Sequence, residues 1–381
     1  MNRIAFIIGD KFLYWNSIIL TLAVVTAIIM FWAMAVRHRE DLKAAVAAVP
    51  MCLIFSLLFA RLVHWYCRPQ GYSNMLAAVT DYSRGGFALI GVFAGCILTA
   101  LLLRLFGGTH NLPRLLDQMS VAGALGIAVG RLAALFSTAD RGILMPKWVP
   151  FPIASRFQSS VSGETEIRLA VFMFQAVIAA ILFICLLCGC LKKKAPKDGD
   201  TCLTFLLWYC GTQAVLDSPR YDSLYFRSNG FVSIVQIFSV LSILLVLIIF
   251  TVRLCRAHQF KKIYLTFLTL PFLGLAGYME YHVQRHGSQA LFSYAVMSLS
   301  MLIALILIMK IRKHAVPKVQ EGFHAARDFY ERNAYMENPG SQPAFDSRPA
   351  GAFRQAAGSA QRPAAKRSSR HYQGKFSSPR N

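Results

Sequence analysis

Long apolar runs, separated by short polar segments, make up most of the first 315 residues of the chain. A run of about 20 apolar residues is long enough to cross a bilayer as a helix. The runs are continuous rather than alternating, so they predict a helical bundle and not a β-barrel. Windows of this length predict membrane-spanning helices over residues 16–36, 44–66, 85–105, 118–137, 168–191, 201–216, 230–252, 264–281 and 290–311.

The connections between these runs alternate in charge. One set is strongly basic and lies around residues 37–39, 104–114, 192–194, 253–262 and 310–313. The other set is longer and of mixed charge, over residues 68–84, 139–166, 217–229 and 280–289. Basic loops stay on the cytoplasmic side of a membrane. The pattern therefore predicts an extracytoplasmic N-terminus and a cytoplasmic C-terminus.

Composition agrees with an integral membrane protein, since 56% of the 381 residues are hydrophobic. The net charge of +22 would indicate nucleic acid in a soluble protein. Here the charges lie between the apolar runs and in the C-terminal segment, so we expect anionic lipid and no nucleic acid. Residues 316–381 contain no apolar run and predict a disordered basic cytoplasmic tail. The cysteines lie mostly in or beside the runs as packing residues, and no metal site is expected.

Arg131 is the most informative charged residue, because it lies near the centre of the apolar stretch 118–137. An arginine within a span is costly and indicates a functional site with an anionic partner. Gly130 and two earlier glycines precede it, which indicates close approach by a helix or a ligand.

Two further arginines lie at the edges of spans, Arg61 in the second run and Arg220 after the sixth. Extension of such side chains to the lipid headgroups is the alternative to a functional role. If Arg131 and Arg220 converge, their planar forks suit a phosphate group. A phospholipid headgroup is the natural anion at that depth. A carrier of small anions would use the same chemistry, so charge alone does not separate an enzyme from a carrier.

Six segments resemble, in order, parts of the bacterial prolipoprotein diacylglyceryl transferases. They are IIGDKFLYWNS, FARLVHWYC, DYSRGGFALIGVFAG, GALGIAVGRLAALFSTADRG, YCGTQAVLDSPRYD and SNGFVSIVQIFSV. The residues that match the family's motifs are Gly130, Arg131, Gly142, Tyr209, Gly211, Arg220, Gly230, Ser233 and Gln236, and Asp217 stands for a glutamate. The resemblance extends from about residue 5 to residue 255.

The resemblance implies an all-α, polytopic helical membrane protein of the bacterial plasma membrane. A seven-span transferase-like core would cover residues 1–255, with two additional spans over 256–315 and the tail over 316–381. Such enzymes move the diacylglyceryl group from phosphatidylglycerol to the thiol of a lipobox cysteine in a prolipoprotein. A thioether forms, glycerol phosphate leaves, and no cofactor is needed. The implied partners are phosphatidylglycerol, prolipoprotein precursors and the membrane.

The resemblance also implies the site residues. Arg131 and Arg220 would be catalytic, because a guanidinium can stabilise the charge that develops on a departing phosphate. The thiol needs a nearby cation or base, since the thiolate is the reactive form. The substrate-binding residues expected by the resemblance are Arg61, Gly85, Gly86, Gly91, Gly130, Tyr209, Asp217 and Gln236.

Several family positions carry other residues. Ile90 stands where the family has a histidine, and the positions of an asparagine, a tyrosine and an arginine are Ala134, Asn16 and Gln213. A substitute base would be one of Asp140, Glu164, Glu166 and Asp217, which otherwise are ordinary interfacial carboxylates. The alternative function is a non-catalytic relative that binds phospholipid or prolipoprotein as a scaffold or regulator. A small-anion carrier would predict an internal repeat between halves, and none is found in the sequence.

Overall fold

The computed structural model describes residues 4–8, 11–37, 42–81, 86–109, 111–158, 165–192, 197–228, 232–286 and 290–315. Gly85, Gly230 and the tail predicted from residue 316 onward lie outside these residues.

Long helices dominate the described residues. They are α1 (Trp15–Arg37), α2 (Leu42–Cys67), α4 (Leu89–Leu105), α5 (Leu112–Arg131), α6 (Val171–Leu191), α7 (Asp200–Leu216), α8 (Ile234–Arg256), α9 (Tyr264–His286) and α10 (Ala290–His314). Seven helical segments in this part of the chain are long and apolar enough to cross a membrane, whereas α4 and α7 have 17 residues each. The prediction of an all-α polytopic membrane protein is confirmed.

Shorter elements complete the described part. They are the helix α3 (Met75–Thr80) and the 3₁₀ turns η1 (Pro69–Gly71), η2 (Leu132–Phe136), η3 (Phe226–Ser228) and η4 (Phe260–Lys262). Two antiparallel hairpins pair β1 (Ile4–Ile8) with β2 (Lys11–Tyr14) and β3 (Ala154–Gln158) with β4 (Thr165–Leu169).

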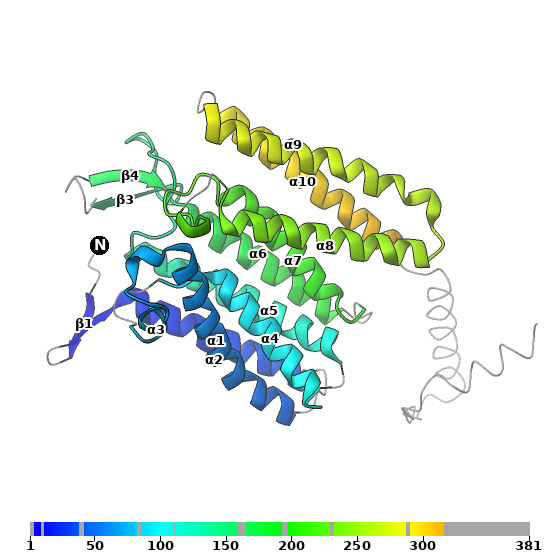
Figure 1. Ribbon diagram of the computed structural model, residues 1–381, viewed down its shortest axis with the longest axis horizontal. Coiled ribbons are helices and arrows are strands. Elements are labelled where there is room, and N and C mark those ends of the chain that lie inside the picture. The colour runs from blue at the N-terminus through cyan, green and yellow to red at the C-terminus, as the bar shows by residue number, and fades with distance from the viewer. Residues whose placement is uncertain are drawn as a thin grey trace, which may run out of the picture. The chain divides into compact units, whose positions relative to one another are not determined.

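The long helices lie side by side, and the strands and α3 gather at one end of them (Figure 1). We call this the strand end. There α2, α5 and α7 finish, and α4, α6 and α8 begin. At the opposite end, which we call the basic end, α1, α4, α6 and α8 finish and α2, α5, α7 and α9 begin, and the sequence that joins them is rich in lysine and arginine.

Two helices begin later than the apolar runs predict. The third predicted span starts at residue 85, but α4 starts at Leu89. Residues 86–88 are non-helical, and Gly86 has a φ of +82°, a left-handed conformation that glycine adopts without strain. The fifth predicted span starts at residue 168, but α6 starts at Val171 because residues 165–169 pair as strand β4.

The central position predicted for Arg131 is wrong. Helix α5 begins at Leu112, where the side chain of Asn111 accepts a hydrogen bond from the backbone of Arg114, and it ends at Arg131. The polar residues before residue 118 form the first turns of α5 and pack in the bundle. They do not form a loop. Asp117 accepts hydrogen bonds from the backbone N–H groups of Gly199 and Cys202, both at 2.7 Å. Arg131 therefore lies at the strand end.

Close glycine contacts hold pairs of helices together. A Cβ atom on Gly91 would lie 2.3 Å from the backbone oxygen of Phe59, and one on Gly95 would lie 2.4 Å from the backbone nitrogen of Ser56. Helix α4 therefore packs with its backbone against α2. A Cβ atom on Gly211 would lie 2.7 Å from the side chain of Leu305, so this leucine of α10 packs directly on the backbone of α7.

The α9–α10 hairpin is joined to the other helices at the basic end as well. Asp200 at the start of α7 forms ion pairs with Arg253 of α8 and with Arg312 of α10. These contacts make the last two helices part of one packed bundle rather than a separate attachment.

Candidate functional site

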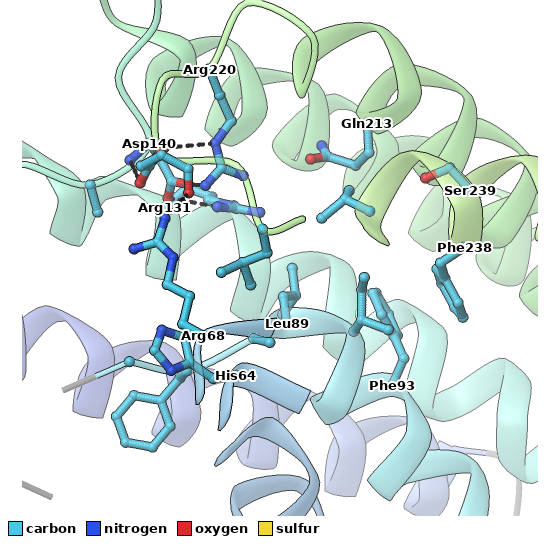
Figure 2. Close-up of a pocket in the computed structure, with 18 of the residues that line it drawn as sticks. His64, Arg68, Leu89, Phe93, Arg131, Asp140, Gln213, Arg220, Phe238 and Ser239 are labelled. Atoms are coloured by element: carbon cyan, nitrogen blue, oxygen red, sulfur yellow. Dashed lines mark hydrogen bonds and ion pairs between the residues drawn. The ribbon is translucent and has the colours of Figure 1, made fainter. Parts of the chain in front are cut away.

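A cavity of about 520 Å³ opens at the strand end, between α2, α4, α5, α7 and α8. Its wall has two parts, which Figure 2 separates clearly. The charged part contains Arg68, Arg131, Asp140, Arg220 and Asp222. The apolar part contains Leu89, Ile90, Phe93, Val235 and Phe238.

Arg131 and Arg220 converge on one carboxylate. Nη1 of Arg131 lies 2.6 Å from Oδ2 of Asp140, and Nη2 of Arg220 lies 2.8 Å from Oδ1 of the same residue. Each carboxylate oxygen thus receives one guanidinium. The prediction that the two arginines converge matches this geometry, with an aspartate of the chain as the shared anion.

Asp140 occupies a special backbone position that turns its side chain to both arginines. Its φ is +56°, a left-handed conformation that aspartate tolerates better than most residues. Its backbone N–H donates to the carboxylate of Asp222 at 3.0 Å. Burial alone would raise the pKa of the Asp140 carboxyl, but the guanidinium groups of Arg131 and Arg220 lower it below its ordinary value. Asp140 is therefore ionised near neutral pH.

Arg220 is anchored by two more carboxylates. Its Nη1 atom lies 2.8 Å from Asp217, and its Nε atom lies 3.2 Å from Asp222. Asp217 is fully buried and does not line the cavity. It accepts a hydrogen bond from the hydroxyl of Ser233, the residue that caps α8. The loop that carries Arg220 is thereby tied to the start of α8.

Gln236 belongs to that same helix start. The side-chain oxygen of Gln236 accepts a hydrogen bond from the backbone N–H of Ser233 at 3.0 Å. The backbone N–H of Gln236 donates to the Ser233 hydroxyl at 3.1 Å. This reciprocal capping box fixes the first turn of α8. Gln236 is not among the residues that line the cavity.

Arg61 is buried away from the cavity. Its guanidinium donates to the backbone oxygens of Ala78 at 2.8 Å and Gly86 at 2.9 Å, and also to that of Asp81. A further donation goes to the hydroxyl of Tyr72 at 3.3 Å. Arg61 therefore holds the segment between α2 and α4 in place and does not extend to the membrane surface.

The remaining predicted residues divide between the cavity and the packing of helices. Tyr209 is buried and lines the cavity, as does Gly86. Gly91 permits the contact between α4 and α2 described above, and a Cβ atom on Gly130 would make an ordinary contact with Ala23 at 3.5 Å. Gly85 lies outside the described residues.

Several polar cavity residues were missed by the sequence analysis or were given no binding role in it. They include His64, Arg68, Gln213 and Asp222. A signal was available for two of them, since Arg61, His64 and Arg68 have the i, i+3 and i+7 spacing of one helix face. Arg68 donates to the backbone oxygen of Asp222 at 3.0 Å, which joins the end of α2 to the Arg220 loop.

Gln213 reaches the cavity from α7 and pairs with a glutamine behind it. The side-chain N–H of Gln175 donates to Oε1 of Gln213 at 2.8 Å. Within the described residues, the side-chain nitrogen of Gln213 has no hydrogen-bond partner. The cavity wall thus contains a buried amide donor next to its apolar part.

The carboxylates considered as substitute bases lie in different surroundings. Asp140 lines the cavity, Asp217 lies behind it, and Glu166 pairs with Arg168 at 2.7 Å. Glu164 lies outside the described residues. In the part of the chain that the structure describes, no three His, Cys, Asp or Glu side chains gather where they could hold a metal ion.

Comparison with known proteins covers the same part of the chain as the cavity. The model of the family described as prolipoprotein diacylglyceryl transferase matches residues 3–252 and so ends within α8. Several curated relatives have the name phosphatidylglycerol–prolipoprotein diacylglyceryl transferase. The relative from Streptococcus sanguinis (strain SK36) is 22% identical over 248 residues, which are 62% of this chain and 92% of the relative.

Two other relatives with that name give similar figures. The protein from Listeria welshimeri serovar 6b is 22% identical over 233 residues, covering 59% of this chain and 80% of the relative. The protein from Oceanobacillus iheyensis is 24% identical over 253 residues, covering 62% and 85%. The family match includes every helix that lines the cavity and excludes α9 and α10. The chain is a multi-pass bacterial membrane protein that belongs to the prolipoprotein diacylglyceryl transferase family.

Proposed function

We propose that this chain transfers the diacylglyceryl group of phosphatidylglycerol to the thiol of a lipobox cysteine in prolipoproteins. The main support is that Arg131 and Arg220 both form ion pairs with one carboxylate, that of Asp140, which faces a cavity. Two guanidinium groups that share two oxygens in this way are placed to share two oxygens of a phosphate.

The charge of the cavity favours an anionic ligand. Its lining holds three guanidinium groups, of Arg68, Arg131 and Arg220, against two carboxylates, of Asp140 and Asp222, which leaves a net charge of +1. The phosphate of the lipid would take the place of the Asp140 carboxylate between the arginines. Charge that develops on the leaving phosphate oxygen would then be stabilised by groups already in position.

The apolar part of the wall suits the lipid's acyl region. Phe93 and Phe238 stack with ring centroids 6.0 Å apart, on the side of the cavity away from Arg131 and Arg220. A phospholipid would therefore place its headgroup at the charged part and its glyceryl carbons between the two parts. The thiolate would attack a glyceryl carbon there, and glycerol phosphate would leave beside the arginines.

The proposed orientation puts the strand end outside the cytoplasm. The basic end carries the connections rich in lysine and arginine, which remain on the cytoplasmic side. The cavity would then open toward the side on which the lipobox cysteine of a secreted precursor emerges. The N-terminus would be extracytoplasmic and the C-terminus cytoplasmic.

Complementation tests the transferase directly. The chain is expressed in bacterial cells depleted of their own transferase, together with a reporter lipoprotein, and mass spectrometry of the reporter's lipobox peptide is the readout. We expect a thioether-linked diacylglyceryl group on the cysteine. An unmodified reporter in cells whose membranes contain the inserted protein would exclude the transferase function.

A non-catalytic lipid-binding relative is the second candidate. Ile90 and Ala134 favour it, because they replace polar family residues with side chains that can neither donate nor accept a proton. This candidate predicts that phosphatidylglycerol vesicles stabilise the purified protein against heat while no thioether forms. The transferase predicts both the stabilisation and the product, so the two measurements separate the candidates.

A further inference from the structure

His64 is a polar cavity residue that the arginine site does not use. It lies in α2 and faces the cavity across from Arg131 and Asp140 (Figure 2). It contributes the one imidazole among the described residues that line this cavity. Histidine is the side chain whose ordinary pKa lies closest to neutral pH, and it is the most common general base in enzymes.

The ring of His64 is held in one orientation. Its Nδ1 atom lies 3.0 Å from the hydroxyl oxygen of Tyr72, and the two rings meet edge to face. The ring also packs on Gly86, where a Cβ atom would lie 2.4 Å from Cε1 and 2.8 Å from Nε2. The ring fits only because residue 86 is glycine. Among the residues that the structure describes, Nε2 of His64 has no hydrogen-bond partner.

The other titratable groups of the cavity are poor bases. Asp140 has a lowered pKa because two guanidinium groups hold its carboxylate, and a carboxylate of low pKa takes up a proton weakly. Asp222 accepts from Arg220 and from the backbone of Asp140. A phenol such as Tyr209 is protonated at neutral pH, since its ordinary pKa is about 10.

We propose that His64 is the general base that removes the proton from the lipobox thiol. The assignment rests on the transfer reaction proposed above. In the tautomer with its proton on Nδ1, the ring donates to the Tyr72 oxygen, and Nε2 is the basic nitrogen. The groups that face the ring are Arg61 and Arg68 of α2 and Tyr72, with Arg131, Asp140 and Arg220 across the cavity.

The proposed transfer step needs no group beyond the thiol, the lipid, His64 and the two arginines. Nε2 of His64 takes the proton of the thiol as the S–H bond breaks, and the sulfur forms a bond to the glyceryl carbon. The bond from that carbon to the phosphate oxygen breaks, and its electron pair stays on the phosphate held by Arg131 and Arg220. The imidazolium then gives its proton to the departing glycerol phosphate or to water.

The first experiment measures transfer against pH. The full-length protein in phosphatidylglycerol vesicles receives a synthetic lipobox peptide, and mass spectrometry follows the lipidated peptide from pH 5.5 to 9. We expect His64→Gln to lose about a hundredfold in rate at pH 7, since general bases contribute on the order of 10²–10⁴-fold. The loss should shrink toward pH 9, where a free thiol of pKa about 8.5 ionises without help.

The chain offers a matched control and a second variant. His282 is also hydrogen-bonded to a hydroxyl, that of Ser293 at 3.1 Å, but does not line the cavity, so His282→Gln should keep the wild-type rate and pH profile. Adding Ile90→His to His64→Gln places an imidazole on the facing helix α4. We expect the double variant to transfer lipid at least about tenfold faster than His64→Gln at pH 7. A misfolded protein would show no such recovery. A His64→Gln protein with the wild-type rate, or with an equal loss at every pH, overturns the assignment.

A second readout does not depend on turnover. Iodoacetamide alkylates the thiolate form of the peptide cysteine, so its rate at pH 7 reports proton removal in the bound state. Peptide bound to wild-type protein should alkylate several-fold faster than peptide bound to His64→Gln. Faster alkylation without lipid transfer would exclude the transferase function but support His64 as the group that removes the thiol proton. Transfer with equal alkylation rates and equal pH profiles would keep the function and exclude the base.

Discussion

Two arginine sites lie within one bundle and differ in the groups that their guanidinium groups contact. Arg61 is 1% exposed and donates to backbone oxygens of the segment between α2 and α4. The side chains of Arg131 and Arg220 are 15% and 10% exposed, and both meet the carboxylate of Asp140 at a cavity. The first arginine is surrounded by fixed groups of the chain, whereas the other two share one carboxylate at a cavity, which the proposed phosphate would replace.

The groups that an arginine in an apolar helix contacts indicate its role. Backbone oxygens cannot leave without unfolding the segment that carries them, so an arginine bound to them stabilises the fold. A carboxylate on a flexible side chain can yield its place to another anion of similar geometry. Burial alone therefore does not mark a functional arginine, and the identity of its partner does.

The largest effect on lipid transfer should come from Arg131→Lys. The lysine keeps a positive charge beside Asp140 but loses the planar fork that two phosphate oxygens require. We expect lipid transfer to the lipobox peptide to fall about a hundredfold, in line with the loss of one preorganised donor, while the melting temperature changes little. Equal transfer rates for the variant and the wild type would show that Arg131 packs but does not bind phosphate.

Arg61→Lys should give the opposite result. Lysine cannot reach all the oxygens that the guanidinium joins, so buried acceptors are left without donors at a cost of about 2–4 kcal/mol in the free energy of unfolding. Thermal denaturation in detergent measures the loss. The folded fraction should transfer lipid at nearly the wild-type rate per molecule. A large loss of turnover with an unchanged melting temperature would place Arg61 in the substrate site.

Asp140→Asn should strengthen anion binding. The amide keeps the size of the side chain but removes the charge that competes with phosphate for Arg131 and Arg220. We expect phosphatidylglycerol to bind about fivefold more tightly, or about 1 kcal/mol, in a vesicle titration. Because the pKa of Asp140 is lowered in the folded state, its carboxyl is ionised in the wild type throughout pH 6–8. The difference in affinity should therefore stay constant across that range, and weaker binding by the variant would contradict the exchange.

The smallest effect on lipid transfer should come from Ser233→Ala. This change removes the N-cap hydroxyl of α8 and its donation to Asp217, the buried anchor of Arg220. We expect a loss of about 1–2 kcal/mol in the free energy of unfolding and a modest rise in KM. Ser298→Ala is the matched control, because that hydroxyl donates to a backbone oxygen on an exposed helix face. Equal melting temperatures for the two variants would exclude a role of the cap in holding the Arg220 loop.

The sequence predicted the helices well because apolar runs of sufficient length have few alternatives in a membrane. It placed Arg131 wrongly because a window of hydropathy counts Asp117 and Arg114 as loop, although they belong to α5. Asp117 is tolerated in the helix since it accepts hydrogen bonds from the start of α7. Such a partner lies more than 80 residues away and leaves no local trace in the sequence.

The candidate site was predicted in part. Motif resemblance selected Arg131, Arg220, Tyr209 and Gly86, which all line the cavity. It also selected Gly91 and Gln236, whose roles in helix packing and helix capping require a glycine and a glutamine without any ligand. The resemblance assigned no role to His64, although FARLVHWYC is one of the matching segments. Only the fold shows that it faces Asp140 across the cavity.

The hydrogen bonds of Asp117 have a mechanical consequence. They fasten the start of α5 to the start of α7 at the basic end. At the other end, Asp140 joins the last residue of α5 to the loop that leaves α7. Because α5 and α7 are joined at both ends, they cannot separate at one end alone. A lipid phosphate that replaced the Asp140 carboxylate, as proposed, would join the same two arginines, so α5 and α7 would stay held together at both ends while the lipid is bound.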